Sequence, residues 1–484
     1  MKKAVCIILV GVLLAVGVIC VGSCSKAKKE STRYEVAVEF KPDDDAIAGT
    51  VKVDFYNEQE VEIDCLKFQL YPNAYRRDAV YSLIGYDVMT EAYYKGQSHG
   101  EMNISSVLGG AGFEIEGVDK NILSIELLQP VPPEGRVVVD IGFVTKLATV
   151  HHRLGVGKRG INFLGAFPVL CAFEDGEFFE CVPSSIGSPF LSECAEYSVQ
   201  LTVPKEYRLA CAGRIDEEKT LESKKRYTVS ALNLREMAFC ISTEYLSEEV
   251  ETGKTKIKYY HFGEKGAEEI VQFAKRAVEY YSSVFGEYPY DTLTIARTNV
   301  AGGAHGVSGL CLIDERLSGI DLVNALLKEI ANVWWYDGVG VNRVSSAWLA
   351  EGLSAYSAAL FLGKYSEYGI EKNDAVENAR KEYAEFLAAY KKALGWVDGR
   401  MNRGLETFLN GYEYESVVEK KSIVMFADLE KSLGHKKMLA GLRRYYTENL
   451  YGRAAQANFV GAFERCGLDI GGFIEGYVEG KGTF

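Results

Sequence analysis

The segment 327–356 constrains the fold of this 484-residue chain more than any other. It begins with Lys-Glu-Ile-Ala-Asn at positions 328–332, which is flanked by apolar residues at helical spacing and lacks Gly and Pro. This pattern predicts a buried or half-buried helix. Residues 328 and 332 are one turn apart, so their side chains leave the same face. The helix therefore presents Lys328 and Asn332 as neighbours, with Glu329 beside them.

The spacing of this turn is that of the zinc-peptidase pattern His-Glu-x-x-His, but the side chains differ. In that pattern two imidazoles hold Zn²⁺, and the Glu beside the first one acts as general base on the bound water. Here Lys328 and Asn332 occupy the two ligand positions. An ammonium repels a cation at contact distance, and a neutral amide is a poor zinc ligand. The helix thus keeps the layout of a zinc site without most of its chemistry.

A second helical segment completes the layout. The chain reads Trp-Leu-Ala-Glu-Gly at 348–352, and eighteen residues separate Asn332 from Glu351. With the Trp pair at 334–335, this arrangement resembles the membrane alanyl aminopeptidases and leukotriene hydrolase, which are gluzincin zinc metallopeptidases. The resemblance runs from about Tyr34 to the C-terminus. It implies an α+β protein with an N-terminal antiparallel β-saddle domain, followed by a mainly helical thermolysin-like peptidase domain.

The resemblance also implies roles for individual positions. Glu329 matches the general base, and Glu351 matches the third zinc ligand. Tyr414 matches the first of two tyrosines, whereas Glu419 stands where the second, oxyanion-stabilising Tyr is expected. With Lys328 in a ligand position, we expect no metal here, although zinc is the cofactor of the parent family.

A glycine-containing segment resembles the family's peptide-binding edge strand. It consists of Gly302, Gly303, Ala304 and His305. The glycines would let a peptide backbone approach closely. His305 replaces the Glu that captures the peptide's free amino group. We interpret His305 as an edge-strand residue rather than as a new metal ligand.

The degenerate site needs a charge to replace the metal. We hypothesise that Lys328 forms an ion pair with Glu351 or Glu329, because carboxylates stripped of zinc are costly to bury without such a partner. Glu419 is a third carboxylate that would compete for the same cation. When Glu419 is considered without the other carboxylates, we interpret it as a solvated helix residue rather than a catalytic acid.

Three functions are compatible with these residues. The leading interpretation is an inactive member of the aminopeptidase family that binds a peptide or a protein partner. The alternative is an active metallopeptidase with a site rebuilt from Glu329, Glu351, Glu419 and His305. A purely structural envelope lipoprotein is the third. The net charge of −13 argues against nucleic acid as a partner.

The N-terminus predicts export. A charged start is followed by an apolar run from Ala4 to Val21 and by small residues ending in Cys24, which is typical of a secretory signal. The Val-Gly-Ser-Cys sequence at 21–24 resembles a bacterial lipobox, in which the Cys is lipidated. An uncleaved signal anchor is the alternative, because the run approaches the roughly 20 residues that span a bilayer. Either way, we expect a protein anchored to the outer face of a bacterial cytoplasmic membrane.

The remaining pattern predicts the domain organisation. Short alternating strands broken by Gly, Pro and Asn extend to about residue 262, and helical periodicity follows. Cysteine spacing shows no Cys-x-x-Cys pair, so a thiolate metal site is not expected, and disulfide pairing stays open. The predicted divisions are a lipoprotein-type signal peptide at 1–24, a linker at 25–33, a β domain at 34–262 and a peptidase-like domain at 263–484.

Overall fold

The structure is a computed structural model that describes residues 30–368 and 372–480. The chain divides into a short unit, Met1–Glu30, and a large compact unit, Ser31–Phe484. The predicted signal peptide and Cys24 lie outside the described residues. Within the described ranges, no helix combines the length and apolar character that crossing a bilayer requires.

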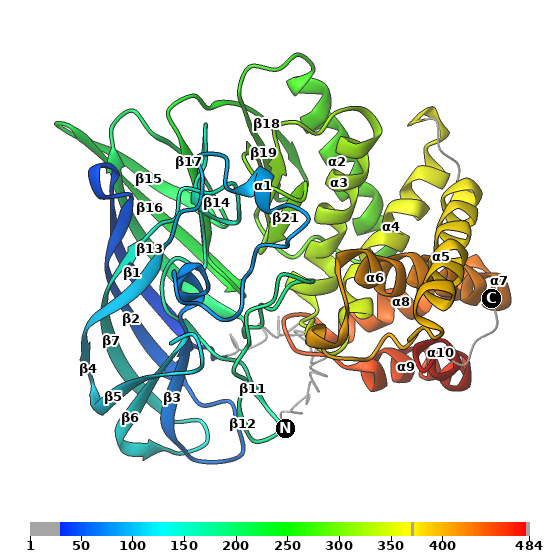
Figure 1. Cartoon of the computed structure of the whole chain (residues 1–484), viewed down its shortest axis with the longest axis horizontal. Helices are drawn as coiled ribbons and strands as arrows, with labels where there is room; N and C mark the ends of the chain where they lie inside the picture. The colour runs from blue at the N-terminus through cyan, green and yellow to red at the C-terminus, as the bar shows by residue number, and fades with distance from the viewer. Residues whose placement is uncertain (1–29, 369–371, 481–484) are drawn as a thin grey trace, which may run out of the picture. The chain divides into compact units, whose positions relative to one another are not determined.

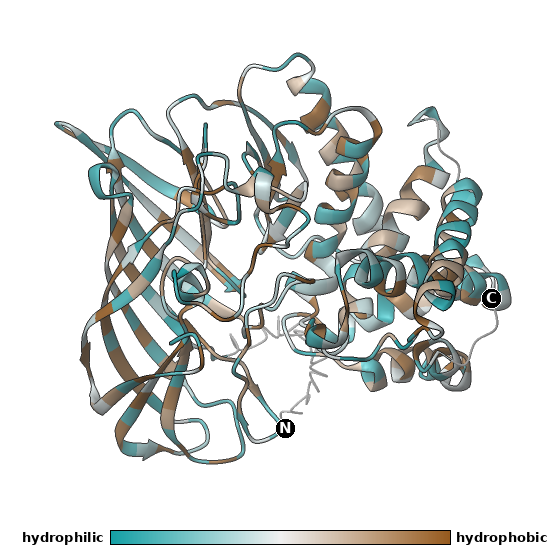
Figure 2. Ribbon diagram, in the orientation of Figure 1, coloured by the Kyte–Doolittle hydropathy of each residue, from teal (hydrophilic) through white to brown (hydrophobic). Residues whose placement is uncertain are grey.

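A seven-stranded sheet organises the N-terminal half of the large unit (Figure 1). Its central strand, β1, runs parallel to β13 and antiparallel to β2. Every second residue of β1 is buried, as the alternating sequence pattern predicts. The same alternation is visible along the sheet in Figure 2. In sheet order the strands are β15 (Arg214–Leu221), β16 (Lys224–Leu234), β13 (Ala195–Pro204), β1 (Arg33–Lys41), β2 (Ala46–Tyr56), β7 (Arg136–Lys146) and β4 (Glu101–Leu108).

Three smaller sheets complete this half. In sheet order they are β10 (Val169–Leu170), β3 (Ile63–Gln69), β6 (Ile122–Val131) and β5 (Gly110–Glu116); β14 (Arg208–Cys211), β17 (Ala238–Ser242), β9 (Ile161–Leu164) and β8 (Leu154–Val156); and the pair β11 (Phe173–Glu174) and β12 (Glu177–Phe178).

A five-stranded mixed sheet leads into the helical half. β19 pairs with β20 in parallel, so hydrogen bonding in this sheet crosses the predicted domain boundary at residue 262. The strand at its far end is β21, which pairs only with β22 among the described strands. In sheet order the strands are β18 (Leu246–Thr252), β19 (Thr255–His261), β20 (Thr292–Thr298), β22 (Leu310–Asp314) and β21 (Ala304–Val307).

The C-terminal half is mainly helical, as predicted. The helix predicted around residues 328–332 is α3, which begins at Gly319, stops at Asn332 and continues as a buried π-helical turn, Val333–Gly338. Its helices are α2 (Ala267–Phe285), α3 (Gly319–Asn332), α4 (Glu351–Lys364), α5 (Lys372–Leu394), α6 (Gly411–Tyr414), α7 (Lys421–Leu433), α8 (His435–Asn449), α9 (Gln456–Glu464) and α10 (Gly471–Val478), whereas the short α1 (Met89–Ala92) lies in the N-terminal half.

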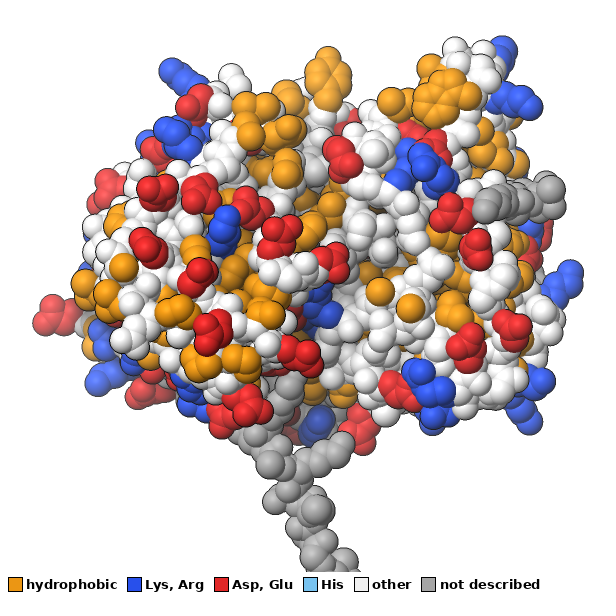
Figure 3. All heavy atoms as spheres, turned by 90° about the horizontal axis from the view of Figure 1, so that it is seen from below, with side chains coloured by type: hydrophobic (Ala, Val, Ile, Leu, Met, Phe, Trp, Pro, Cys, Tyr) orange, Lys and Arg blue, Asp and Glu red, His pale blue; other side chains and the backbone are white. Residues whose placement is uncertain are grey.

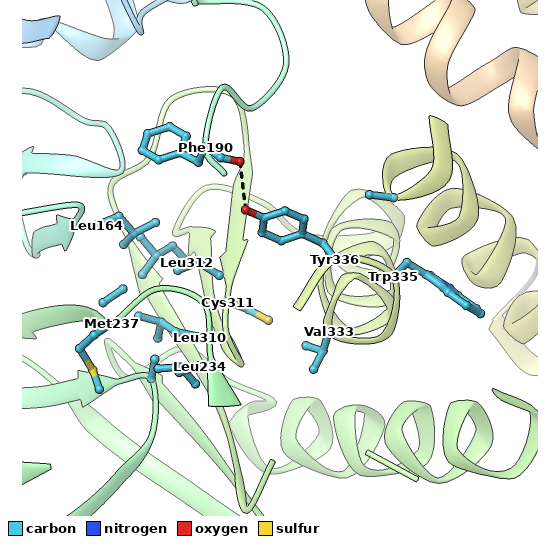
Figure 4. Close-up of a cluster of buried hydrophobic side chains, with 14 of the residues drawn as sticks. Leu164, Phe190, Leu234, Met237, Leu310, Cys311, Leu312, Val333, Trp335 and Tyr336 are labelled. Atoms are coloured by element: carbon cyan, nitrogen blue, oxygen red, sulfur yellow. Dashed lines mark hydrogen bonds between the residues drawn. The ribbon is translucent and has the colours of Figure 1, made fainter. Parts of the chain in front are cut away.

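Polar contacts join the two halves at the π-helical turn. Fully buried Arg235 donates to the carbonyls of Tyr336, Ser192 and Gly452. The Tyr336 hydroxyl donates to the carbonyl of Phe190 at 3.0 Å (Figure 4). Because charged donors meet buried carbonyls, these contacts hold the loop around residue 190 against the end of α3.

The cysteines and the surface are unremarkable in chemistry. No disulfide joins the eight cysteines of the described residues to one another. On the face shown in Figure 3, acidic and basic side chains are interspersed, without a continuous patch of one sign. The buried thiols, which belong to the core or lie against it, are Cys171, Cys181, Cys211, Cys240 and Cys311.

Candidate functional site

Helices α3 and α4 bring the predicted ligand positions together. The Trp335 indole donates to the Ser357 hydroxyl at 2.8 Å, and the Ser354 hydroxyl donates to Asn332 Oδ1 at 3.4 Å. Gly352 is needed for packing, because a Cβ at this position would collide with Ser422 of α7. The glycine of the Trp-Leu-Ala-Glu-Gly segment therefore lets α4 and α7 approach closely.

Lys328 forms its ion pair with Glu419, and this corrects the predicted partners Glu351 and Glu329. The Lys328 ammonium lies 2.6 Å from a carboxylate oxygen of Glu419. The prediction of Glu419 as a solvated residue is also wrong, because its side chain is only 16% exposed. It lies in a second π-helical turn, Glu415–Lys420, which directs it towards α3. The position where the family resemblance implies an oxyanion-stabilising Tyr thus holds the counter-ion of Lys328.

Glu351 has a different cation, Arg343, which no sequence motif indicates. Arg343 Nη1 lies 3.6 Å from Glu351 Oε1, and the guanidinium carbon lies 3.2 Å from the centre of the Tyr336 ring. Arg343 is 3% exposed. The available signal was an Arg in the loop just before the second helix, but loop residues carry no periodicity that places them. Glu351 is thus paired with Arg343, and Lys328 is paired with Glu419.

Glu329 lies against the edge strand. A Cβ at Gly306 of β21 would collide with the Glu329 carboxylate, so the glycine provides the room for this side chain. Burial, and then the charge of Glu351, raise the pKa of Glu329 to about 7, although Lys328 acts in the opposite direction. This carboxyl group is therefore partly protonated near neutral pH.

The ionisable groups of the site shift one another's pKa values. Burial lowers the pKa of Lys328, but Glu419, and then Glu351 and Glu329, outweigh it, so the net pKa is raised and Lys328 stays an ammonium. Burial raises the pKa of Glu419 despite the opposing effect of Lys328. Two cations, Lys328 and Arg343, are thus paired with two carboxylates of the site, Glu419 and Glu351.

Tyr414 lies at the site, but its hydroxyl group is not hydrogen-bonded to any described residue. This hydroxyl group is buried. Burial, and then the charges of Glu351 and Glu419, raise its pKa well above the usual value. Its ring lies against Gly187, where a Cβ would contact it. Tyr414 therefore remains a neutral hydroxyl.

The predicted peptide-binding segment forms the free edge of the five-stranded sheet. Gly302 and Gly303 have φ angles of +88° and +100°, which favour glycine, and they make the turn that enters β21. Ala304 and His305 follow in the strand, opposite Ile313 and Leu312. Burial lowers the pKa of His305 well below its usual value, so the imidazole is neutral.

The residues present do not fit zinc. An ammonium stands at the first ligand position, and the second, Asn332, accepts a hydrogen bond from Ser354. The remaining ligand position, Glu351, is paired with Arg343. Across the residues that the structure describes, no three His, Cys, Asp or Glu side chains are grouped to hold a metal ion. A catalytic zinc site needs about three protein ligands and an open position, and this donor set supplies one carboxylate.

The comparison with curated proteins points to one family of peptidases. No family model matches the chain. It is similar to the probable M1 family aminopeptidases 1 and 2 of Encephalitozoon cuniculi, each 21% identical over 238 residues. The match covers 44% of this chain and 26% of each relative, about a quarter of their length.

Solved structures of the same family match the fold over nearly the whole chain. The M1 zinc metallopeptidase of Deinococcus radiodurans has a TM-score of 0.64 at 14% identity, covering 94% of both chains. A mutant of it bound to a Tyr-Ser-Ala substrate has a TM-score of 0.65 at 14% identity, covering 93% of this chain and 94% of that one. This chain has the two-domain fold of the M1 zinc metallopeptidases. Both comparisons return M1 proteins, which confirms the resemblance to the aminopeptidase family.

The positions that the family resemblance implies for the site mostly carry other side chains. The position implied for the general base keeps a carboxylate, Glu329. Both imidazole positions, the amine-capturing position and the oxyanion position carry other side chains: Lys328, Asn332, His305 and Glu419. Chemically, the arrangement offers a strand edge that is unpaired among the described strands, two cations that are paired with carboxylates, and a carboxyl group whose pKa is about 7.

Proposed function

We propose that this chain is a catalytically degenerate M1-type module that binds peptides or an extended protein segment without hydrolysing them. The observation that carries the proposal is the Lys328–Glu419 ion pair at 2.6 Å. It places a fixed positive charge where an M1-type enzyme would hold its metal, and it uses the residue at the oxyanion position as the counter-ion. Zinc polarises the scissile carbonyl and activates water in such enzymes, and these residues supply neither effect.

Peptide binding is supported by the edge of the five-stranded sheet. β21 has a hydrogen-bonded neighbour on one side only, within the part of the chain that the structure describes. An unpaired edge offers main-chain donors and acceptors to an extended peptide. Gly302 is exposed and Gly303 is half-buried, so no side chain at these positions blocks the approach.

The test combines metal content with peptide binding and turnover. We expect the purified chain, prepared with zinc supplied and without chelator, to contain less than about 0.1 zinc per chain by mass spectrometry, because Lys328 and Arg343 already neutralise the carboxylates. A panel of short peptides should bind saturably without release of amino acids. About one tightly held zinc per chain together with peptide hydrolysis would contradict the proposal.

A hydrolase that works without the lost ligands is the second candidate, and one observation favours it. Glu329 has a pKa of about 7, which suits a general base at neutral pH. In this case Glu329, with Glu351, Glu419 and His305, would form the rebuilt site. Peptide turnover in the same assay would support this candidate, whereas neither binding nor turnover would favour a structural envelope protein.

We also propose that the module is exported and tethered to the outer face of a bacterial cytoplasmic membrane through a lipidated Cys24. Acyl chains add about 0.8 kcal/mol of membrane affinity per buried methylene. Substituting Cys24→Ala should therefore move the chain from the membrane fraction to the soluble fraction of fractionated cells. A variant that stays in the membrane fraction would instead support an uncleaved anchor.

A further inference from the structure

A pocket of about 170 Å³ lies beside the peptide-binding edge strand. Its wall includes Gly302 and His305 of the edge segment, Arg153 and Phe190 from the N-terminal half, and Gly187. Since Gly187 also touches the Tyr414 ring, the pocket borders the degenerate site. Drug-sized ligands occupy pockets of about 300–1,000 Å³. This pocket is smaller, so it suits one side chain or one chain end.

Arg153 is a buried cation without a bonded counter-ion. It is 7% exposed, and its guanidinium carbon stacks 3.9 Å from the centre of the Phe190 ring. No described residue accepts a hydrogen bond from it or forms an ion pair with it, and its Nε is both buried and unbonded. A buried charge without a partner is costly, so such a group is typical of a site that a ligand completes.

The other ionisable groups nearby do not supply the missing partner. Glu236 acts on Arg153 through space, but burial raises its pKa to about 7 and it forms no ion pair with Arg153 within the described structure. His152, in the pocket wall, has its pKa lowered to about 3 by burial, so it is neutral. Asp87 also belongs to the wall, but it is an exposed residue whose charge water and salt screen.

His305 adds a second unsatisfied group. Its Nε2 is buried and has no hydrogen-bond partner among the described residues. Its ring packs edge-on against His152, with 5.6 Å between the ring centres. A neutral imidazole beside an arginine does not attract the ammonium of a peptide. An anion, in contrast, gains from the guanidinium, whose planar donors match a carboxylate.

We propose that this pocket binds a carboxylate of the peptide ligand, with the Arg153 guanidinium as its counter-ion and His305 beside it. The proposal rests on the proposed peptide-binding function and names the chemistry that the ligand carries. The carboxylate is either the free C-terminus of the peptide or an acidic side chain, because the small pocket accepts either.

Four capped tripeptides test the proposal by isothermal titration calorimetry on the full chain. The probes are acetyl-Ala-Ala-Ala with a free carboxylate, the same peptide as its amide, acetyl-Ala-Glu-Ala amide, and Ala-Ala-Ala amide with a free amine. We expect at least one carboxylate probe to bind at least about tenfold tighter than the uncharged amide. The tighter of the two carboxylate probes identifies the source of the carboxylate.

Variants separate this pocket from general peptide binding. Arg153→Gln should remove the tenfold preference, whereas Arg226→Gln, an exposed Arg on β16, should keep it. His305→Glu places a negative charge in the pocket, so it should weaken the carboxylate probes and strengthen the free-amine probe. His305 is only half-buried on an edge strand, so this variant remains informative if Arg153→Gln fails to fold.

The outcomes are distinguishable. Equal affinity for all four probes would overturn the carboxylate proposal, as would a preference that survives in folded Arg153→Gln. In both cases peptide binding itself, and the proposed function with it, would stand. Absence of binding by every probe would contradict both.

Discussion

Histidines at both ligand positions, Lys328→His with Asn332→His, are expected to raise zinc affinity by at least about a hundredfold over the native chain, or about 3 kcal/mol. The change removes an ammonium that repels the metal at contact distance and supplies two imidazoles one turn apart on α3, with Glu351 of α4 as the third ligand. Zinc titration by calorimetry measures the gain.

Peptide hydrolysis is expected to stay low in this double variant. His305 and Glu419 still occupy the amine-capturing and oxyanion positions, and Arg343 still competes for Glu351 at 3.6 Å. Asn332→His alone is the matched control and should not take up zinc, because it keeps the ammonium of Lys328. High aminopeptidase activity in the double variant would show that positions 305 and 419 matter little. Failure to bind zinc would show that α3 and α4 no longer hold a metal-site geometry.

The second large effect is a pH-dependent gain in stability from Glu329→Gln. The pKa of Glu329 is about 7 in the folded chain, against an ordinary value of 4.5. Between these values the unfolded carboxyl group ionises while the folded one keeps its proton, so the native chain loses stability as pH rises through this window. Glutamine cannot ionise. The free energy of unfolding of the variant should therefore exceed that of the native chain by about 3 kcal/mol above pH 7, with the difference shrinking towards pH 5.

Urea unfolding at pH 5, 6, 7 and 8 measures this difference. Glu114→Gln, at an exposed position of β5, is the control and should change stability by less than about 0.5 kcal/mol at every pH. A difference between Glu329→Gln and the native chain that does not grow between pH 5 and pH 7 would show that Glu329 is ionised throughout this range.

The helices and the first strands were predictable because local patterns specify them. Alternation in β1 and helical periodicity in α2 and α4 are read directly from neighbouring residues, and the structure has strands before residue 262 and helices after it at these elements. The end of α3 was less predictable. Its buried Trp residues fit helical spacing, but the chain turns there into a π-helix that accommodates contacts with Arg235.

These local sequence patterns do not predict the ion pairs of the site. Lys328 and Glu419 are 91 positions apart, and nothing in their local sequence couples them. Arg343 and Arg153 lie in segments without periodicity, so their meeting with Glu351 and with the pocket depends on how the two halves pack. The carboxylate pocket itself exists only where these halves adjoin.

The sequence by itself determined that the two imidazole positions are Lys328 and Asn332, and that they lie one turn apart on a helix whose partner helix carries Glu351. Side-chain identity and helical spacing are local properties, so no tertiary information was needed. Only the tertiary structure decided which carboxylate neutralises Lys328 and which cation neutralises Glu351. It also decided that Arg153 lines a pocket without a bonded counter-ion. Those outcomes depend on distances between segments far apart in the chain, which packing alone brings together.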